Sequence, residues 1–221
     1  MTQDADSAPS FPVLNAIEAR ILGCLIEKQA TTPEQYPLTE NAIQLACNQK
    51  TNREPIMDVS PGDVAHAVRR MEERRLVRNT QSARALRFEH KASQAYSLTP
   101  PQQAIVAILL LRGPQTPSEI RTRTNRMATF ADAEDLQHAL DRLQQRDAPL
   151  IVRVPRSGGQ REDRYMHLLS GPIDVEALRS ASASASAHET GVTRDELSQR
   201  VAELEARVEA LEQLMRRADD A

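Results

Sequence analysis

Apolar side chains recur at intervals of three and four residues between positions 60 and 75, the spacing that places them on one face of an α-helix. The residues of this stripe are Val64, Ala67, Val68 and Met71. Ser60 precedes the stripe as a predicted N-cap, Pro61 follows at the first helical position and Asp63 places an acid in the first turn. The pattern therefore predicts an amphipathic helix that begins directly after Ser60.

The pattern changes after this helix. Leu76-Val77-Arg78 and Ala85-Leu86-Arg87-Phe88 are short segments of strand type, separated by a turn-rich gap from Asn79 to Arg84. They predict a β-hairpin behind the helix. A helix followed by a hairpin is the second half of a winged helix-turn-helix domain.

Two further helices are predicted upstream. Leu14, Ile17, Ile21, Leu22, Leu25 and Ile26 have helical spacing and predict a first helix over 14–29. Thr39 is the predicted N-cap of a second helix that runs to about Cys47. The polar segment from Asn48 to Arg53 then leads toward the third helix.

The same order of elements occurs a second time. A capped helix begins at Thr99 and stops at Gly113, Thr116 to Glu119 forms a capping box, and a third helix starts at about Asp132. Its apolar stripe repeats that of the earlier third helix with an offset of 72 residues, and consists of Leu136, Ala139, Leu140 and Leu143. Segments 150–154 and 164–169 predict a second hairpin. The sequence thus predicts a mainly α fold with small β-hairpins (α+β), built from two tandem winged helix-turn-helix domains, 14–99 and 100–171.

The remaining segments differ in character. Residues 1–13 are polar and predict a disordered tail, and 172–192 are rich in Ser and Ala, as in a linker. In 193–218, Val201 and Val208 occupy a positions and Leu197, Leu204 and Leu211 occupy d positions of a heptad pattern. This arrangement favours a parallel two-stranded coiled coil, and hence a homodimer. The alternative, a helix that folds back on its own domain, stays open.

Four long strings resemble the YceH-like family of bacterial proteins. They are GCLIEKQATTPEQYPLTENAI (23–43), ACNQKTNREP (46–55), LLLRGPQTPSEIRTRTNRM (109–127) and REDRYMHLLSG (161–171). The resemblance covers Leu14 to Gly171 and implies a pair of tandem winged-helix domains. It implies little about activity, because the family has no established biochemical function.

Composition and charge restrict the kind of core and the kind of binding partner that the chain can have. Aromatic residues make up only 3% of the chain and Trp is absent, so the core must be aliphatic. Residues 1–99 carry 12 basic and 12 acidic side chains, 100–171 carry 10 and 8, and 172–221 carry 6 and 11. The two domains are therefore close to neutral, which leaves room for a basic patch but not for the strongly basic surface of a dedicated nucleic-acid binder.

Candidate DNA contacts follow from the predicted domains, since a winged helix inserts its third helix into the major groove. In the first domain they are Asn48, Gln49, Lys50, Asn52 and Arg53 in the turn, His66, Arg69 and Arg70 on the exposed helical face, and Arg84 near the hairpin tip. In the second domain they are Arg121 and Arg126 on its second helix, and Arg156 and Arg161 on its hairpin. The acids Asp63, Glu72 and Glu73 lie on or beside the same face and oppose this interpretation.

Structural alternatives exist for each group. Mixed charge is common on a solvated helical face, Asn and Thr in a turn often bond the backbone, and Arg161 to Arg164 can form an internal ion-pair cluster. Tyr165 and His167 alternate in the last strand and are expected to pack against the hairpin.

No enzyme class is indicated. The five histidines are dispersed, no metal-ligand spacing or phosphate-binding glycine loop occurs, and Cys24 and Cys47 are expected to be buried thiols. We expect no catalysis, no metal and no cofactor. The N-terminus has no signal-peptide pattern and no segment is long enough for a membrane span, so a cytoplasmic protein is expected. Two hypotheses remain: a dimeric DNA-binding regulator, or a protein-interaction scaffold that uses winged helices without DNA.

Overall fold

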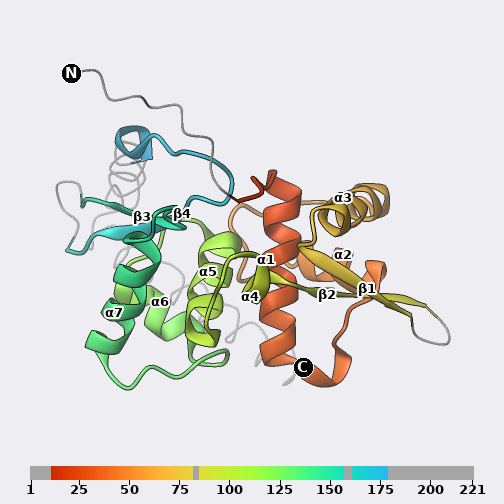
Figure 1. The fold of residues 1–221 in the computed structure, drawn as a ribbon, viewed down its shortest axis with the longest axis horizontal. Coiled ribbons are helices and arrows are strands. Elements are labelled where there is room, and N and C mark those ends of the chain that lie inside the picture. The colour runs from red at the N-terminus through yellow and green to blue at the C-terminus, as the bar shows by residue number, and fades with distance from the viewer. Residues whose placement is uncertain (1–10, 82–84, 157–160, 179–221) are drawn as a thin grey trace, which may run out of the picture. The chain divides into compact units, whose positions relative to one another are not determined.

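The computed structural model describes residues 11–81, 85–156 and 161–178. In these residues it is a mixed α+β structure with eight helices and two antiparallel β-hairpins (Figure 1). The chain divides into two compact units, and the first of them (1–156 and 160–175) contains every helix and strand named below. The predicted N-terminal tail up to residue 10, Arg84 and the heptad segment 193–218 lie outside the described residues.

Two modules follow one another in this unit. The elements of the first are α1 (Ala16–Thr31), the 3-10 helix η1 (Pro33–Gln35), α2 (Glu40–Cys47), α3 (Pro61–Glu73), β1 (Val77–Gln81), β2 (Leu86–His90) and the short α4 (Ala92–Ala95). The elements of the second are α5 (Pro100–Arg112), α6 (Pro117–Thr124), α7 (Ala133–Gln144), β3 (Ile151–Val154) and β4 (Arg164–His167). We call them the first and the second module.

The predicted starts of α3 and α6 are confirmed by their caps. The Ser60 hydroxyl accepts a hydrogen bond from the Asp63 amide at 3.2 Å, and the Asp63 carboxylate accepts one from the Ser60 amide at 3.3 Å. Thr116 and Glu119 make the same reciprocal pair at 3.2 and 2.9 Å. Each pair satisfies two amide groups that a helix end leaves without an internal partner, which fixes where α3 and α6 begin.

Several elements differ from the predictions in their bounds or were not predicted. The segment Asn79 to Gln81, predicted as part of the turn, belongs to β1 and pairs with Leu86 to Phe88. Asn and Thr resemble turn residues locally, but here the ladder with β2 decides their conformation. Helices η1 and α4 were not predicted, and α1 runs from Ala16 to Thr31 rather than from Leu14 to Gln29.

Each hairpin is tied to its own module in the same way. Leu38, directly before the N-cap of α2, exchanges two backbone hydrogen bonds with Phe88, at 3.1 and 2.7 Å. Gln115, directly before the N-cap of α6, exchanges two with Tyr165, at 3.0 and 2.7 Å. The repeat predicted from helix order therefore extends to the backbone pairing.

The two modules meet where α1 packs along α5 (Figure 1). Both helices carry long buried runs, from Glu18 to Ile26 in α1 and from Ala104 to Leu111 in α5. The contact is close at Gly23, where an added Cβ would lie 2.9 Å from Leu111 Cγ and 3.1 Å from Leu110 Cβ. Gly23 is thus required for the distance between the helices, not for its backbone flexibility.

We expect Gly23→Ala to destabilise the protein by about 2 kcal/mol, because overpacking at this contact outweighs the higher helix propensity of alanine. Gly62→Ala in the first turn of α3 is the matched control, since its nearest neighbour would be Ser60 Oγ at 3.8 Å. That variant should be stabilised by about 0.5 kcal/mol. Urea denaturation of both proteins measures the difference, and equal effects would contradict the packing argument.

Candidate functional site

The outward face of α3 presents three predicted contact residues to solvent. The apolar stripe of Val64, Ala67, Val68 and Met71 is buried, so His66, Arg69 and Arg70 point away from the core and are exposed. Arg69 has no ion-pair or hydrogen-bond partner within the described residues. Arg70 Nε lies 3.4 Å from the buried Glu18 carboxylate, which makes its shorter contact, 2.5 Å, with Arg74. Within the part of the chain that the structure describes, the Arg69 side chain is thus unpaired, and that of Arg70 has a longer ion-pair distance to Glu18 than Arg74 has.

Two of the three acids near this face have other partners. Asp63 is held in the capping box with Ser60, and Glu72 accepts a hydrogen bond from the Asn79 side chain. Glu73 remains exposed. The acids still contribute negative charge, but only Glu73 is free to compete for Arg69.

Arg53 was predicted as a contact residue, and the structure places it inside the protein. Its side chain is fully buried, and it donates two hydrogen bonds to the Glu27 carboxylate, at 3.1 and 2.6 Å. Its Nε donates to the Ala46 carbonyl at 3.0 Å and Nη2 donates to Gln49 Oε1 at 2.7 Å. The prediction for Arg53 is therefore wrong, because every side of its guanidinium is used within the fold.

The turn that contains Arg53 is held by further internal bonds. Asn48 accepts from the Val59 amide at 2.8 Å and donates to the Val59 carbonyl at 2.9 Å. Buried Arg20 of α1 donates to the Cys47 and Pro55 carbonyls, at 3.1 and 2.6 Å. Asn48 thus acts as a backbone clamp, as in the structural alternative, and Gln49 is engaged by Arg53.

Lys50 and Asn52 of the same turn lie in a cavity of about 550 Å³ together with Arg126 of the second module. We call this cavity the basic cleft; it is formed by the C-terminal ends of α1 and α5, the loop between α2 and α3, and α6 with the residues that follow it. Its cationic side chains are Lys28, Lys50, Arg112, Arg123 and Arg126, and its one acidic side chain is Glu27. The cleft is therefore strongly positive in a unit that is nearly neutral.

Sequence reasoning missed three of these cations as contact residues: Lys28, Arg112 and Arg123. Arg112 ends α5 and donates to the Asn52 side chain, while Arg123 lies 3.3 Å from Glu119. Burial, together with repulsion from Arg123 and Arg53, lowers the pKa of Arg112. No local signal identifies these residues, because they meet only when α5 and α6 pack beside the first module.

The other predicted arginines of the second module do not enter the cleft. Arg121 is exposed on α6, and Arg156 donates to the Arg161 carbonyl at 3.2 Å. The ion pairs of this hairpin join Asp163 to Arg153 and Arg164 to Glu119, so the cluster predicted within 161–164 forms with residues outside it.

Predicted contact residues thus occur on the α3 face (His66, Arg69 and Arg70) and in the basic cleft (Lys50, Asn52 and Arg126), and these two places are separate. Arg70 contacts Glu18 in the first turn of α1, whereas Lys28 of the basic cleft lies in its last turn. At 1.5 Å per residue, these ends of α1 are roughly 15 Å apart.

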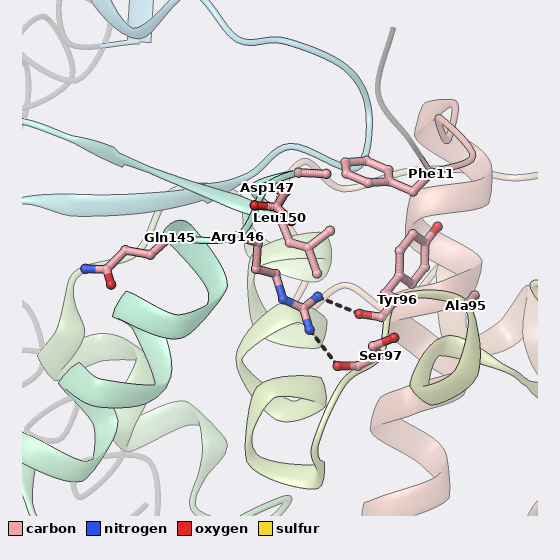
Figure 2. Close-up of a pocket in the computed structure, with 9 residues that line it drawn as sticks. Phe11, Ala95, Tyr96, Ser97, Gln145, Arg146, Asp147 and Leu150 are labelled. Carbon is pink, nitrogen blue, oxygen red and sulfur yellow. Dashed lines mark hydrogen bonds between the residues drawn. The ribbon is translucent and has the colours of Figure 1, made fainter. Parts of the chain in front are cut away.

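A second cavity, of about 520 Å³, has fewer charged side chains that could bind a ligand (Figure 2). Arg146 donates to the carbonyls of Tyr96 and Ser97, at 2.5 and 2.6 Å, and the Phe11 ring packs edge-on against Tyr96. Its one cation is therefore committed to the backbone, and the contact connects the end of α7 to the segment after α4.

Two cysteines and two histidines of the described residues are buried. Cys24 and Cys47 are free and buried, as predicted. His90 Nδ1 accepts from the Ala92 amide, so its Nε2 donates to Gln29 Oε1 at 2.7 Å. Burial lowers the pKa of His90 and of His167 from 6.5 to about 4. Both rings are therefore neutral packing groups near pH 7.

Neither metals nor membranes are indicated by the described part of the chain. It contains no group of three or more His, Cys, Asp or Glu side chains that could hold a metal ion. None of the helices it contains has both the length and the apolar character needed to cross a bilayer.

The described residues define a mixed α+β protein of two repeated helix–hairpin modules with an exposed arginine face and a basic cleft. A family model described as "Protein of unknown function, DUF480" matches residues 14–160. The chain belongs to this family, and bacterial relatives of the chain carry the name UPF0502. The resemblance to a family without established activity is thereby confirmed.

Three relatives show how much of the chain is shared. A UPF0502 protein of Stenotrophomonas maltophilia (strain K279a) is 50% identical over 209 residues, which cover 95% of each chain. One from Xanthomonas oryzae pv. oryzae (strain MAFF 311018) is 52% identical over 198 residues, covering 89% of this chain and 88% of its own. One from Pseudomonas fluorescens (strain Pf0-1) is 46% identical over 220 residues, which cover 100% of both. The similarity therefore extends beyond the two modules.

Arg53→Gln is expected to lower the free energy of unfolding by about 3 kcal/mol, because it leaves Glu27 and the Ala46 carbonyl without their main partner. Lys50→Gln, three residues away and exposed, should change it by less than about 0.5 kcal/mol. Chemical denaturation tests the pair. Equal stability of the two variants would show that Arg53 is not a structural residue.

The buried histidines predict a loss of stability in acid. Below pH 6.5 the unfolded chain binds protons that the native state accepts only near pH 4, so the free energy of unfolding falls as the pH drops through this window. Each histidine should contribute about 3 kcal/mol over the window. In a His90→Gln/His167→Gln variant, the free energy of unfolding should depend less steeply on pH between pH 6.5 and 4, as measured by denaturation curves. A His138→Gln control, at an exposed histidine, should show the same steep pH dependence as the wild-type protein. An unchanged slope in the double variant would refute the assignment.

Proposed function

We propose that this protein is a winged-helix DNA-binding protein that contacts DNA through α3 of the first module. The observation that carries the proposal is the exposed face of α3, on which Arg69 has no partner among the described residues and Arg70 is only loosely held. An arginine fork can read guanine or grip a phosphate, and it does so best when no internal acid holds it.

The arrangement of elements supports the winged-helix interpretation. In each module two capped helices and a hairpin follow the first helix, and the hairpin pairs with the residue before the second helix. In a winged helix the third helix enters the major groove, while the hairpin and the second helix lie near phosphates. The exposed side chains of α3 are then the base-reading set.

The second module is a weaker candidate for DNA contact than the first. Its third helix, α7, begins with Asp132 as N-cap and continues with Glu134 and Asp135, all of them exposed. This acidic end would repel phosphate where α3 offers His66 and Arg69. We therefore assign base contact to the first module alone.

Dimerisation is a separate part of the proposal. The heptad pattern of residues 193–218 lies outside the described residues, and it supports a homodimer by sequence alone. A dimer would place two α3 helices on one duplex, as in many regulators that read paired half-sites.

A protein-interaction scaffold is the second candidate. Leu45 on α2 and Ile56 in the following loop are each 64% exposed, and large apolar side chains in such positions can anchor a protein partner. This candidate predicts no salt-dependent DNA binding.

Arg69→Ala combined with Arg70→Ala should weaken binding to a pool of random-sequence duplexes by about tenfold or more, and should reduce the slope of log K against log salt by about 1 to 2. Fluorescence anisotropy at several salt concentrations measures both quantities.

The matched comparison uses single substitutions in the two modules. Arg142 is exposed on α7 and lies 72 residues after Arg70, at the equivalent position of the repeat. Arg142→Ala should leave DNA affinity within about twofold, whereas Arg70→Ala, at the matched position of the first module, should lower it. If wild-type protein binds no DNA at low salt, the proposal fails and the scaffold is favoured; if both single variants bind equally well, α3 is not the reading helix.

A further inference from the structure

The basic cleft shares no residue with the DNA contact proposed for α3. Its cations come from four segments that are distant in sequence: Lys28 in α1, Lys50 in the loop after α2, Arg112 in α5, and Arg123 and Arg126 at α6. Packing of α1 against α5 brings these segments together. Convergence of like charges is costly unless an anion balances them.

Among the described residues, the charge in the cleft is balanced only in part, by Glu27 within the lining and by Glu119, which lies 3.3 Å from Arg123. Both carboxylate oxygens of Glu27 are held by Arg53, and Lys28 lies 3.5 Å from the same group. Lys50 and Arg126 have no ion-pair or hydrogen-bond partner among the residues that the structure describes, and both are exposed. Two cations in the cavity are thus available to an incoming anion.

The rest of the lining suits an organic molecule rather than an inorganic ion alone. Ile108 and Met127 supply apolar surface, while Asn125 and Thr51 supply polar groups at the same cavity. A volume of about 550 Å³ is within the range of roughly 300 to 1,000 Å³ that is usual for small-molecule sites, which often lie where two domains meet. The cleft therefore has space for an apolar or aromatic part beside its charged part.

We propose that the basic cleft binds a small organic anion with two or more phosphate groups, of the class of a nucleoside diphosphate. Arginine and lysine side chains hold phosphate through short charge-assisted hydrogen bonds, and several of them can share a diphosphate. The ring of such a ligand would lie against Ile108 and Met127. A duplex backbone fits less well, because the cations surround one hollow instead of following a stripe across the surface.

The test uses isothermal titration calorimetry on the full chain with three probes: adenosine diphosphate, pyrophosphate and adenosine. We expect the two phosphorylated probes to bind and adenosine not to bind. Lys50→Gln combined with Arg126→Gln should weaken binding of adenosine diphosphate by about tenfold or more, because two charged donors are lost.

A control variant with the same loss of charge distinguishes binding in the cleft from a general effect of the protein's net charge. Arg121→Gln combined with Arg142→Gln removes two exposed arginines outside the cleft lining, and it should bind adenosine diphosphate within about twofold of wild type. The proposal would be overturned if adenosine diphosphate and pyrophosphate both failed to bind at millimolar concentration. Equal losses in the two double variants, or a Lys50/Arg126 variant that loses only duplex DNA binding, would also overturn it. None of these results depends on whether Arg69 and Arg70 contact DNA.

Discussion

The close packing of α1 against α5 is the constraint on which the rest of the described structure depends. Gly23 allows the side chains of Leu110 and Leu111 to lie almost against the backbone of α1. Each of these helices is the first long helix of its module, and their packing is the main contact between the two repeats within one compact unit. The same contact brings Lys28 and Arg112, at the ends of the two helices, to one cavity.

Buried arginines organise the loop that leads into α3. Arg20 and Arg53 donate to the backbone carbonyls of Ala46, Cys47 and Pro55. Ala46 and Cys47 end α2, so their carbonyls belong to the group that a helix end leaves without an internal partner. A guanidinium has five donors in a fixed plane, so it can satisfy several carbonyls at once. Because Arg53 also neutralises Glu27, it fixes the loop and removes the one acid of the basic cleft from competition.

The two proposed sites use the repeat differently. At α3 the first module alone supplies exposed arginine, and the corresponding helix of the second module is acidic at its start. At the basic cleft both modules contribute, and neither would form the site alone. A repeat can thus diverge in one surface while a shared surface is created at the junction of its copies. Fold similarity does not assign either function; the side chains at each site do.

Local patterns in the sequence determined the helices, their caps and the order of both modules, because capping boxes and apolar stripes act within a few residues. Ser60 with Asp63 and Thr116 with Glu119 are examples that the structure confirms. Only the tertiary structure decided which charged residues are buried and which are exposed. Arg53 and Lys50 are three positions apart in one polar run, yet Arg53 is buried and Lys50 is exposed. The difference arises from Glu27, which lies 26 residues before Arg53 in the sequence and reaches it only when α1 packs beside the loop.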